Sequence, residues 1–235
     1  MKRIADIRLY ESDIPNVDYN SLPHDLGRIY DYDHMACLEV IQRLLFLLRH
    51  RGFGFEKFDH LYVNFTPCVP QGEVRNVNRS YQYEHARIRY VDVGCDMEIF
   101  NSWDQDAKQN FVLNGIKQAV LLKAPEEMRE LFSQTFDEVL KQGDNLLIPY
   151  KEKENADYRV EVLTRIDDDV DFLPLIRVTD KEGNVVAEKQ LRGYGRDEFI
   201  SQISTITIGK HYVKIANRKN WYADFYDLKP IRIEW

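Results

Sequence analysis

The sequence predicts an α+β fold: three helices, mostly in the first 143 residues, packed on an antiparallel sheet, with a C-terminal half that is a β-meander. Two observations support this class. Apolar residues recur at helical spacing in three stretches before Gly143, and after it the pattern changes to strand-like alternation and stays there. Helices followed by runs of strands are typical of α+β proteins.

The most apolar stretch is 33–54, and we expect it to form a central helix. Its apolar residues repeat at intervals of three and four, which makes one helical stripe: Met35, Leu38, Ile41, Leu45 and Leu48. Residues 44–48 are all apolar, so this helix needs cover on more than one side. Asp31 or Asp33 can cap its start, and Gly52 suits the left-handed residue that ends it.

Two further helices follow before residue 143. The pattern of Ser102 with Gln105 three residues later is a capping box, which predicts that a helix begins there. Gly115 in the middle of this helix indicates close packing against a neighbour. Pro125 suits the first turn of the next helix, whose apolar stripe ends at Gly143.

Alternating apolar residues predict strands on both sides of these helices. In the first half they are 4–10, 60–66 and 84–93, and the polar stretch 71–83 is expected to be a loop. In the second half they are 146–151, 158–166, 172–179, 185–191, 205–208, 211–216, 221–226 and 231–235. Gly183 marks a hairpin turn. We expect one domain over residues 1–235, with a possible subdivision into a helix-rich part, 1–143, and a β part, 144–235.

The composition limits the classes of function. The 235 residues carry a formal net charge of −7, which argues against a protein that binds nucleic acid by neutralising phosphates and favours a basic protein partner. Cys37, Cys68 and Cys95 are odd in number and widely spaced, which fits a reducing cytoplasm better than a disulfide framework. The sequence shows no secretion signal and no membrane span, so we expect a cytoplasmic protein that contacts no membrane.

The common sequence signatures of cofactor, metal and nucleophile sites are missing. The histidines and cysteines have no zinc-site spacing, no serine lies in a nucleophile motif, and no glycine-rich phosphate loop occurs. Asp167, Asp169 and Asp171 alternate as in a calcium loop, but the glycine and the bidentate glutamate of that loop are absent. We therefore expect no cofactor and no metal, and interpret 167–171 as a solvated acidic loop.

Two groups of charged residues are candidate sites for small molecules. His85, Arg87 and Arg89 alternate along one strand and could bind an anion, although partner carboxylates on a neighbouring strand are the favoured explanation. Asp92, Asp96 and Glu98 cluster after the same strand and could serve a hydrolase whose site is dispersed over the chain. A surface turn is the favoured explanation of these three carboxylates.

Aromatic residues near the C-terminus are the candidate surface for a protein partner. Tyrosine and tryptophan supply much of the binding energy at protein interfaces. The candidates are Tyr212, Trp221, Tyr222, Phe225, Tyr226 and Trp235. If 221–226 is a strand, Trp221 and Tyr222 must point to opposite faces, so at least one of them is exposed.

These observations favour a non-enzymatic, cytosolic protein-binding protein. In general style, small acidic α+β proteins of this kind resemble bacterial immunity proteins, which neutralise a toxin partner, although no motif of this chain carries that resemblance. An immunity-like or antitoxin-like inhibitor is therefore the first hypothesis. The alternatives are a hydrolase that uses Asp92, Asp96, Glu98 or His85, and an anion or small-ligand binding protein that uses the strand face of His85, Arg87 and Arg89.

Overall fold

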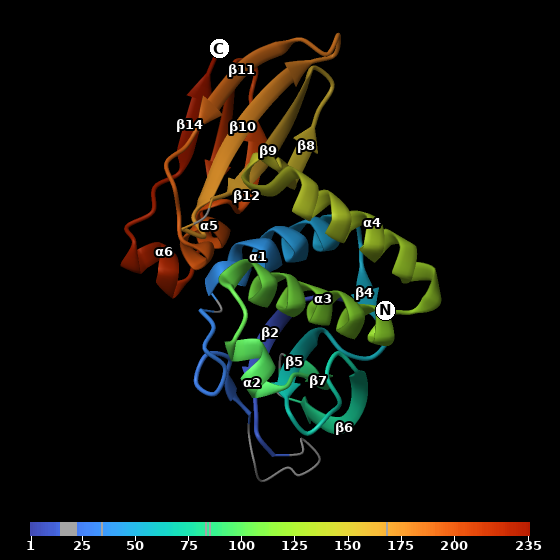
Figure 1. The fold of residues 1–235 in the computed structure, drawn as a ribbon. Coiled ribbons are helices and arrows are strands. Elements are labelled where there is room, and N and C mark those ends of the chain that lie inside the picture. The colour runs from blue at the N-terminus through green and yellow to red at the C-terminus, as the bar shows by residue number, and fades with distance from the viewer. Residues whose placement is uncertain (15–22, 34, 83, 85, 168) are drawn as a thin grey trace. The chain divides into compact units, whose positions relative to one another are not determined.

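The computed structural model describes residues 1–14, 23–33, 35–82, 84, 86–167 and 169–235. The chain divides into two compact units, Met1–Lys141 and Gln142–Trp235 (Figure 1). The first unit holds a mixed sheet with helices, and the second holds antiparallel sheets with two short helices. The α+β class is therefore confirmed.

The first unit is built on a five-stranded sheet in the order β3-β2-β5-β7-β6. Its three inner strands, β2, β5 and β7, run parallel, and the two edge strands, β3 and β6, run antiparallel to their neighbours. The strands are β2 (Asp6–Glu11), β3 (His24–Asp25), β5 (His60–Thr66), β6 (Val74–Gln82) and β7 (Arg87–Gly94), and a separate pair joins β1 (Lys2–Arg3) to β4 (Gly54–Phe55).

Two predictions for this unit are wrong. The sheet beside the helices is not antiparallel, because the connection from β2 to β5 passes through a helix and returns the chain in the same direction, as a parallel crossover requires. The predicted loop over 71–83 contains β6, which pairs with β7 at the sheet edge. An edge strand needs no continuous apolar pattern, which is why its polar sequence was misleading.

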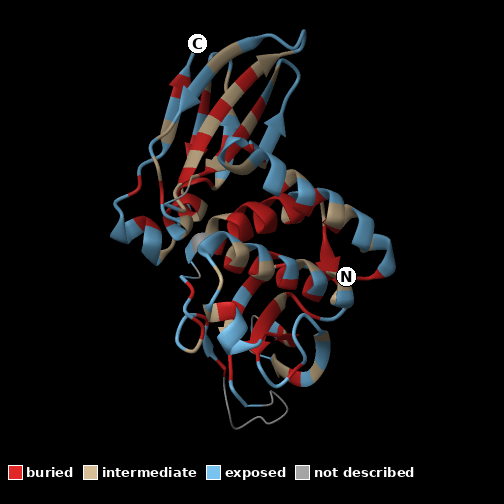
Figure 2. Ribbon diagram, in the orientation of Figure 1, coloured by how far each residue is buried: buried red, intermediate tan, exposed pale blue. Residues whose placement is uncertain are grey.

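The three predicted helices are present. They are α1 (Met35–His50), α3 (Gln105–Lys123) and α4 (Glu126–Gln142), and a short α2 (Met97–Asn101) precedes α3. Of these, α1 and α3 cover one face of the sheet (Figure 1). Figure 2 shows α1 buried along most of its visible length, as its wide apolar arc predicts. Gly115 of α3 packs against β5, because a Cβ there would lie 3.0 Å from the ring of Phe65.

The start of α3 differs from the predicted capping box. Asp104 is its N-cap, and the carboxylate of Asp104 accepts a hydrogen bond from the backbone N–H of Ala107 at 2.8 Å. Ser102 instead caps the end of α2. At the start of α1, the carboxylate of Asp33, one of the two predicted caps, accepts a hydrogen bond from the backbone N–H of Met35 at 3.0 Å.

The second unit is antiparallel throughout its described strands. A four-stranded sheet has the order β11-β10-β9-β8, and a three-stranded sheet has the order β12-β13-β14. The elements are η1 (Gly143–Asn145), β8 (Ile148–Glu154), β9 (Tyr158–Ile166), β10 (Phe172–Asp180), β11 (Val185–Gln190), α5 (Arg196–Gln202), β12 (Thr205–Ile208), β13 (Tyr212–Ala216), α6 (Trp221–Phe225) and β14 (Ile231–Glu234). Gly183 has a φ of 86°, as its predicted hairpin turn requires.

The described residues form six α-helices, so the prediction of three is too low. The most important difference is α6, because the sequence analysis expected a strand over 221–226. The side chain of Asn220 accepts a hydrogen bond from the backbone N–H of Ala223 at 3.0 Å, which satisfies a free donor of the first helical turn. Ala223 is buried and fixes the helix to its unit.

Candidate functional site

Four exposed aromatic side chains gather on α6 and the residue that follows it. Trp221, Tyr222, Phe225 and Tyr226 are 65%, 36%, 64% and 44% exposed, and we call these four residues the aromatic patch. Trp221 and Phe225 are one helical turn apart, and their rings stack with centroids 4.9 Å apart. Tyr222 packs edge-on against Trp221, and Tyr226 packs edge-on against Phe225.

Because residues 221–225 form a helix, the expectation that Trp221 and Tyr222 point to opposite faces of a strand is wrong. Trp221 and Tyr222 lie on the exposed side together, because successive residues of a helix are about 100° apart and do not alternate between two faces. Ala223 and Leu228 supply the buried contacts instead. A hydrogen bond with Asp197 raises the pKa of Tyr222 above its ordinary value.

The other two predicted partner residues serve the sheets of the second unit. Tyr212 on β13 is half-buried, with the guanidinium of Arg232 3.9 Å from its ring centroid. Trp235 is half-buried and packs edge-on against Tyr158, with ring centroids 5.0 Å apart. Both residues thus have ring contacts that account for them.

The predicted anion site is described only in part, because His85 lies outside the described residues. Arg87 is exposed and Arg89 is half-buried. Burial and, to a lesser extent, the positive charge of Arg89 lower the pKa of Lys123. An anion site at Arg87 and Arg89 stays a prediction.

Two of the three predicted catalytic carboxylates have structural partners, and the two partners differ. Asp92 is buried and accepts from the side-chain amide of Asn64 at 2.8 Å. Asp96 caps α2 by accepting from the backbone N–H of Ile99 at 2.9 Å, and Glu98 is exposed in the first turn of that helix. These contacts account for Asp92 and Asp96 without catalysis.

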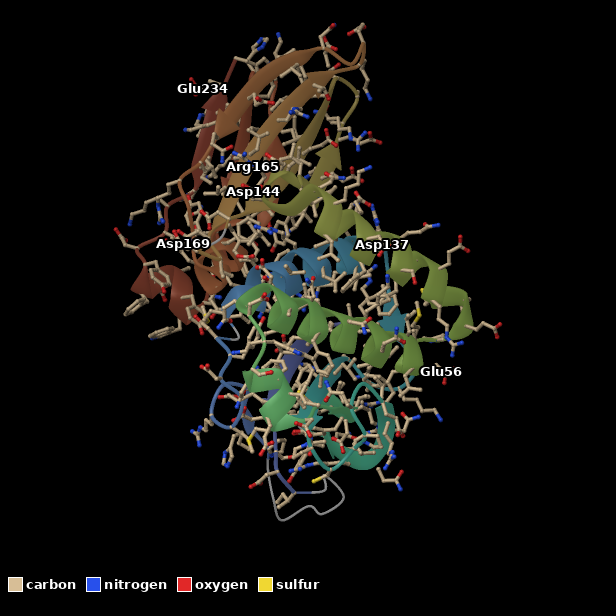
Figure 3. All side chains as sticks on the ribbon, viewed as in Figure 1. Glu56, Asp137, Asp144, Arg165, Asp169 and Glu234 are labelled. Atoms are coloured by element: carbon tan, nitrogen blue, oxygen red, sulfur yellow. The ribbon has the colours of Figure 1, made fainter. Side chains whose placement is uncertain are left out.

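Among the described residues, histidine, cysteine, aspartate and glutamate side chains form no group of three or more that could hold a metal ion. Glu56, in the bend that follows β4, and Asp137, on α4, are labelled in Figure 3. Within the predicted acidic loop, the backbone N–H of Asp171 donates to the carboxylate of Asp167 at 2.8 Å, while Asp168 lies outside the described residues.

A cavity of about 640 Å³ lies on the first unit's sheet, and the sequence analysis did not anticipate it. Its lining includes Arg8, Tyr10, His60, Tyr62, Tyr81 and Tyr90. The signal was present, because His60 and Tyr62 alternate with Leu61 and Val63 along β5. Strand residues that alternate with the helix-covered core must point to the opposite face of the sheet.

The cysteines give a prediction that thiol labelling can check. Burial raises the pKa of Cys37 to about 11 and that of Cys95 to about 12, whereas Cys68 is exposed. Since the thiolate is the reactive form, we expect Cys68 alone to react with a thiol reagent at pH 8 in the native protein. In denaturant without a reducing agent, all three should react. Two slow thiols that stay unreactive in denaturant would instead indicate a disulfide.

Among the described residues, no helix combines the length and the apolar character that crossing a membrane requires.

Comparisons with known proteins give no family for this chain. We found no protein-family model, no curated protein and no solved structure that matches the chain.

Proposed function

We propose that this protein is a non-enzymatic, cytosolic protein-binding protein whose contact surface is the aromatic patch. The observation that supports the proposal is the exposure of four adjacent aromatic rings on α6 and the residue that follows it. Single exposed apolar residues are normal, but a contiguous exposed group marks an interaction surface. Tryptophan and tyrosine are also the residues most enriched among those that dominate binding energy.

The patch is arranged before any partner arrives. Each of its rings contacts another ring of the patch, at centroid distances of 4.9 to 5.1 Å. Rings that are already held lose less conformational entropy on binding than free side chains do. Because less conformational entropy is lost, more of the free energy gained by burying these rings contributes to the affinity.

The charge of the chain favours a basic partner. The formal net charge is −7; Asp224 lies in α6, and Asp227 lies two residues after the end of that helix. A field of this sign accelerates the approach of a basic protein, and added salt screens it. Within this class, an inhibitor that neutralises a basic toxin, as immunity proteins and antitoxins do, is the function that we propose. The aromatic patch would then hold the complex after charge has guided the approach.

Binding kinetics of variants test the proposal directly. We expect Trp221→Ala and Phe225→Ala each to cost at least about 2 kcal/mol of binding free energy, an increase in dissociation rate of about thirty-fold. Added salt should mainly lower the association rate. The measurement is surface-based kinetics with a basic partner that has been captured from cell extract and identified.

Val185→Ala is the matched control, because Val185 is also exposed, at 54%, and lies on β11 of the same unit. It should leave both rate constants unchanged. Equal dissociation rates for the wild type and both aromatic variants would exclude the aromatic patch as the interface. Turnover of ester, phosphate or glycoside substrates without any captured partner would favour the hydrolase alternative instead.

A further inference from the structure

An arginine of the second unit is held by an aromatic ring and a carboxylate together. The guanidinium of Arg232 on β14 lies 3.9 Å from the ring centroid of Tyr212 on β13, and its Nε donates to Glu234 at 2.6 Å. The ring attracts the cation through its negative π face, and the carboxylate accepts its N–H. The side chains of Arg232 and Glu234 are both more than half exposed, so this combination forms at the surface.

A second arginine of the same unit repeats this arrangement. The guanidinium of Arg192 lies 4.1 Å from the ring centroid of Tyr194 and forms an ion pair with the carboxylate of Glu198 on α5. A planar guanidinium can place its face on the ring while its N–H groups meet the carboxylate, whereas the ammonium of lysine is a compact, strongly hydrated point charge. In this unit, a ring beside a carboxylate is therefore a site for arginine.

The aromatic patch contains the ring and the carboxylate of this arrangement. Trp221 and Asp224 are three residues apart on α6, which makes their side chains neighbours on the helix surface. Trp221 is 65% exposed although Phe225 stacks on it, so its indole has open surface for a further contact. Among the described residues, no cationic group lies over a ring of the patch, and the Asp224 carboxylate has no hydrogen-bond or ion-pair partner.

A second carboxylate lies on the other side of the patch. Asp197 of α5 is exposed and forms a hydrogen bond with Tyr222. At about 100° per residue, Tyr222 lies about 100° from Trp221 around the axis of α6, and Asp224 lies about 60° away in the opposite direction. The two carboxylates thus flank the rings. A cation is attracted from both sides, whereas an anion is repelled.

We propose that the aromatic patch binds an arginine side chain of its protein partner, whose guanidinium packs on the indole of Trp221 and donates to the carboxylate of Asp224. This inference rests on the proposed function and specifies what the partner presents to the patch. The complex would then complete at α6 the combination that Arg232 and Arg192 form within the unit. Arginine is also among the residues most enriched at the centres of protein interfaces.

NMR of the tryptophan side chains in the full chain tests this inference with short peptides. The chain has three tryptophans, and the indole N–H signals of the half-buried Trp103 and Trp235 serve as internal references for that of Trp221. Trp221→Phe assigns the third signal. The probes are capped tri-arginine, tri-lysine and tri-citrulline peptides, because citrulline keeps the shape of arginine without its charge. We expect tri-arginine to shift the Trp221 signal, tri-lysine to bind at least about five-fold more weakly, and tri-citrulline to leave all three signals unchanged.

Variants of Asp224 test the role of its carboxylate. Asp224→Asn should weaken the binding of tri-arginine about five-fold, because it removes the charged acceptor. Asp224→Glu keeps that acceptor and should stay within about two-fold of the wild type. Asp157→Asn is the matched control, since it removes the same charge from the exposed bend between β8 and β9 of the same unit. It should leave the affinity unchanged.

Three results would each overturn the inference: equal affinities for tri-arginine and tri-lysine, no shift of the Trp221 signal, or equal affinities in Asp224→Asn and the wild type. The kinetic assay with Trp221→Ala and Phe225→Ala tests the aromatic patch itself. If these variants release the captured partner faster while the peptide test fails, the proposed function stands and arginine is not the group that the patch recognises.

Discussion

Replacing Leu45 by alanine is expected to reduce the free energy of unfolding by about 2–5 kcal/mol, the range found for truncated core leucines. Leu45 lies in the all-apolar stretch of α1 and has no exposed surface. Removing its side chain loses the burial of apolar area and leaves a cavity that its neighbours cannot fully close. Urea unfolding followed by circular dichroism measures the change.

Leu140 provides the matched control for this prediction. It ends the predicted apolar stripe of α4, yet it is 47% exposed. Leu140→Ala should therefore change the free energy of unfolding by less than about 0.5 kcal/mol, as exposed substitutions do. A loss below about 1 kcal/mol for Leu45→Ala would mean that α1 is peripheral to the stability of the protein.

The sequence was informative where structure depends on local periodicity. The stripe of α1 and the stop at Gly52, whose φ is 77°, could be read from neighbouring residues. The parallel order of β2, β5 and β7 could not, because strand pairing is set by contacts between residues that are far apart in the chain. Alternation identifies the strands but does not identify their neighbours.

The aromatic patch could also be predicted only in part from the sequence. Aromatic residues favour strands, so the run around Trp221 and Tyr222 suggested one. In the structure the Asn220 cap and the burial of Ala223 outweigh that preference and form a five-residue helix. The residue types were sufficient to nominate the aromatic patch, whereas their common exposure depends on tertiary contacts.

Gly94 is a position whose importance the sequence did not reveal and the structure does. It ends β7, and a Cβ on it would lie 1.8 Å from the carbonyl oxygen of Pro70. Its backbone N–H donates to Glu73 and its carbonyl accepts from Gly72, both at 2.8 Å. Glycine is required here because another segment of backbone approaches closely, a condition that residues near in sequence do not encode.

We therefore expect Gly94→Ala to cost about 3 kcal/mol or more of unfolding free energy, since an added methyl must displace backbone and strain two hydrogen bonds. Gly195→Ala is the control, because a Cβ at Gly195 would meet no other segment within 4 Å; since Gly195 is the N-cap of α5, where alanine is less favourable than glycine, it should cost at most about 1 kcal/mol. Urea unfolding of both variants makes the comparison. A loss below about 1 kcal/mol for Gly94→Ala would show that the segment around Pro70 moves aside at little cost, and that the close contact at the end of β7 is not a constraint on the fold.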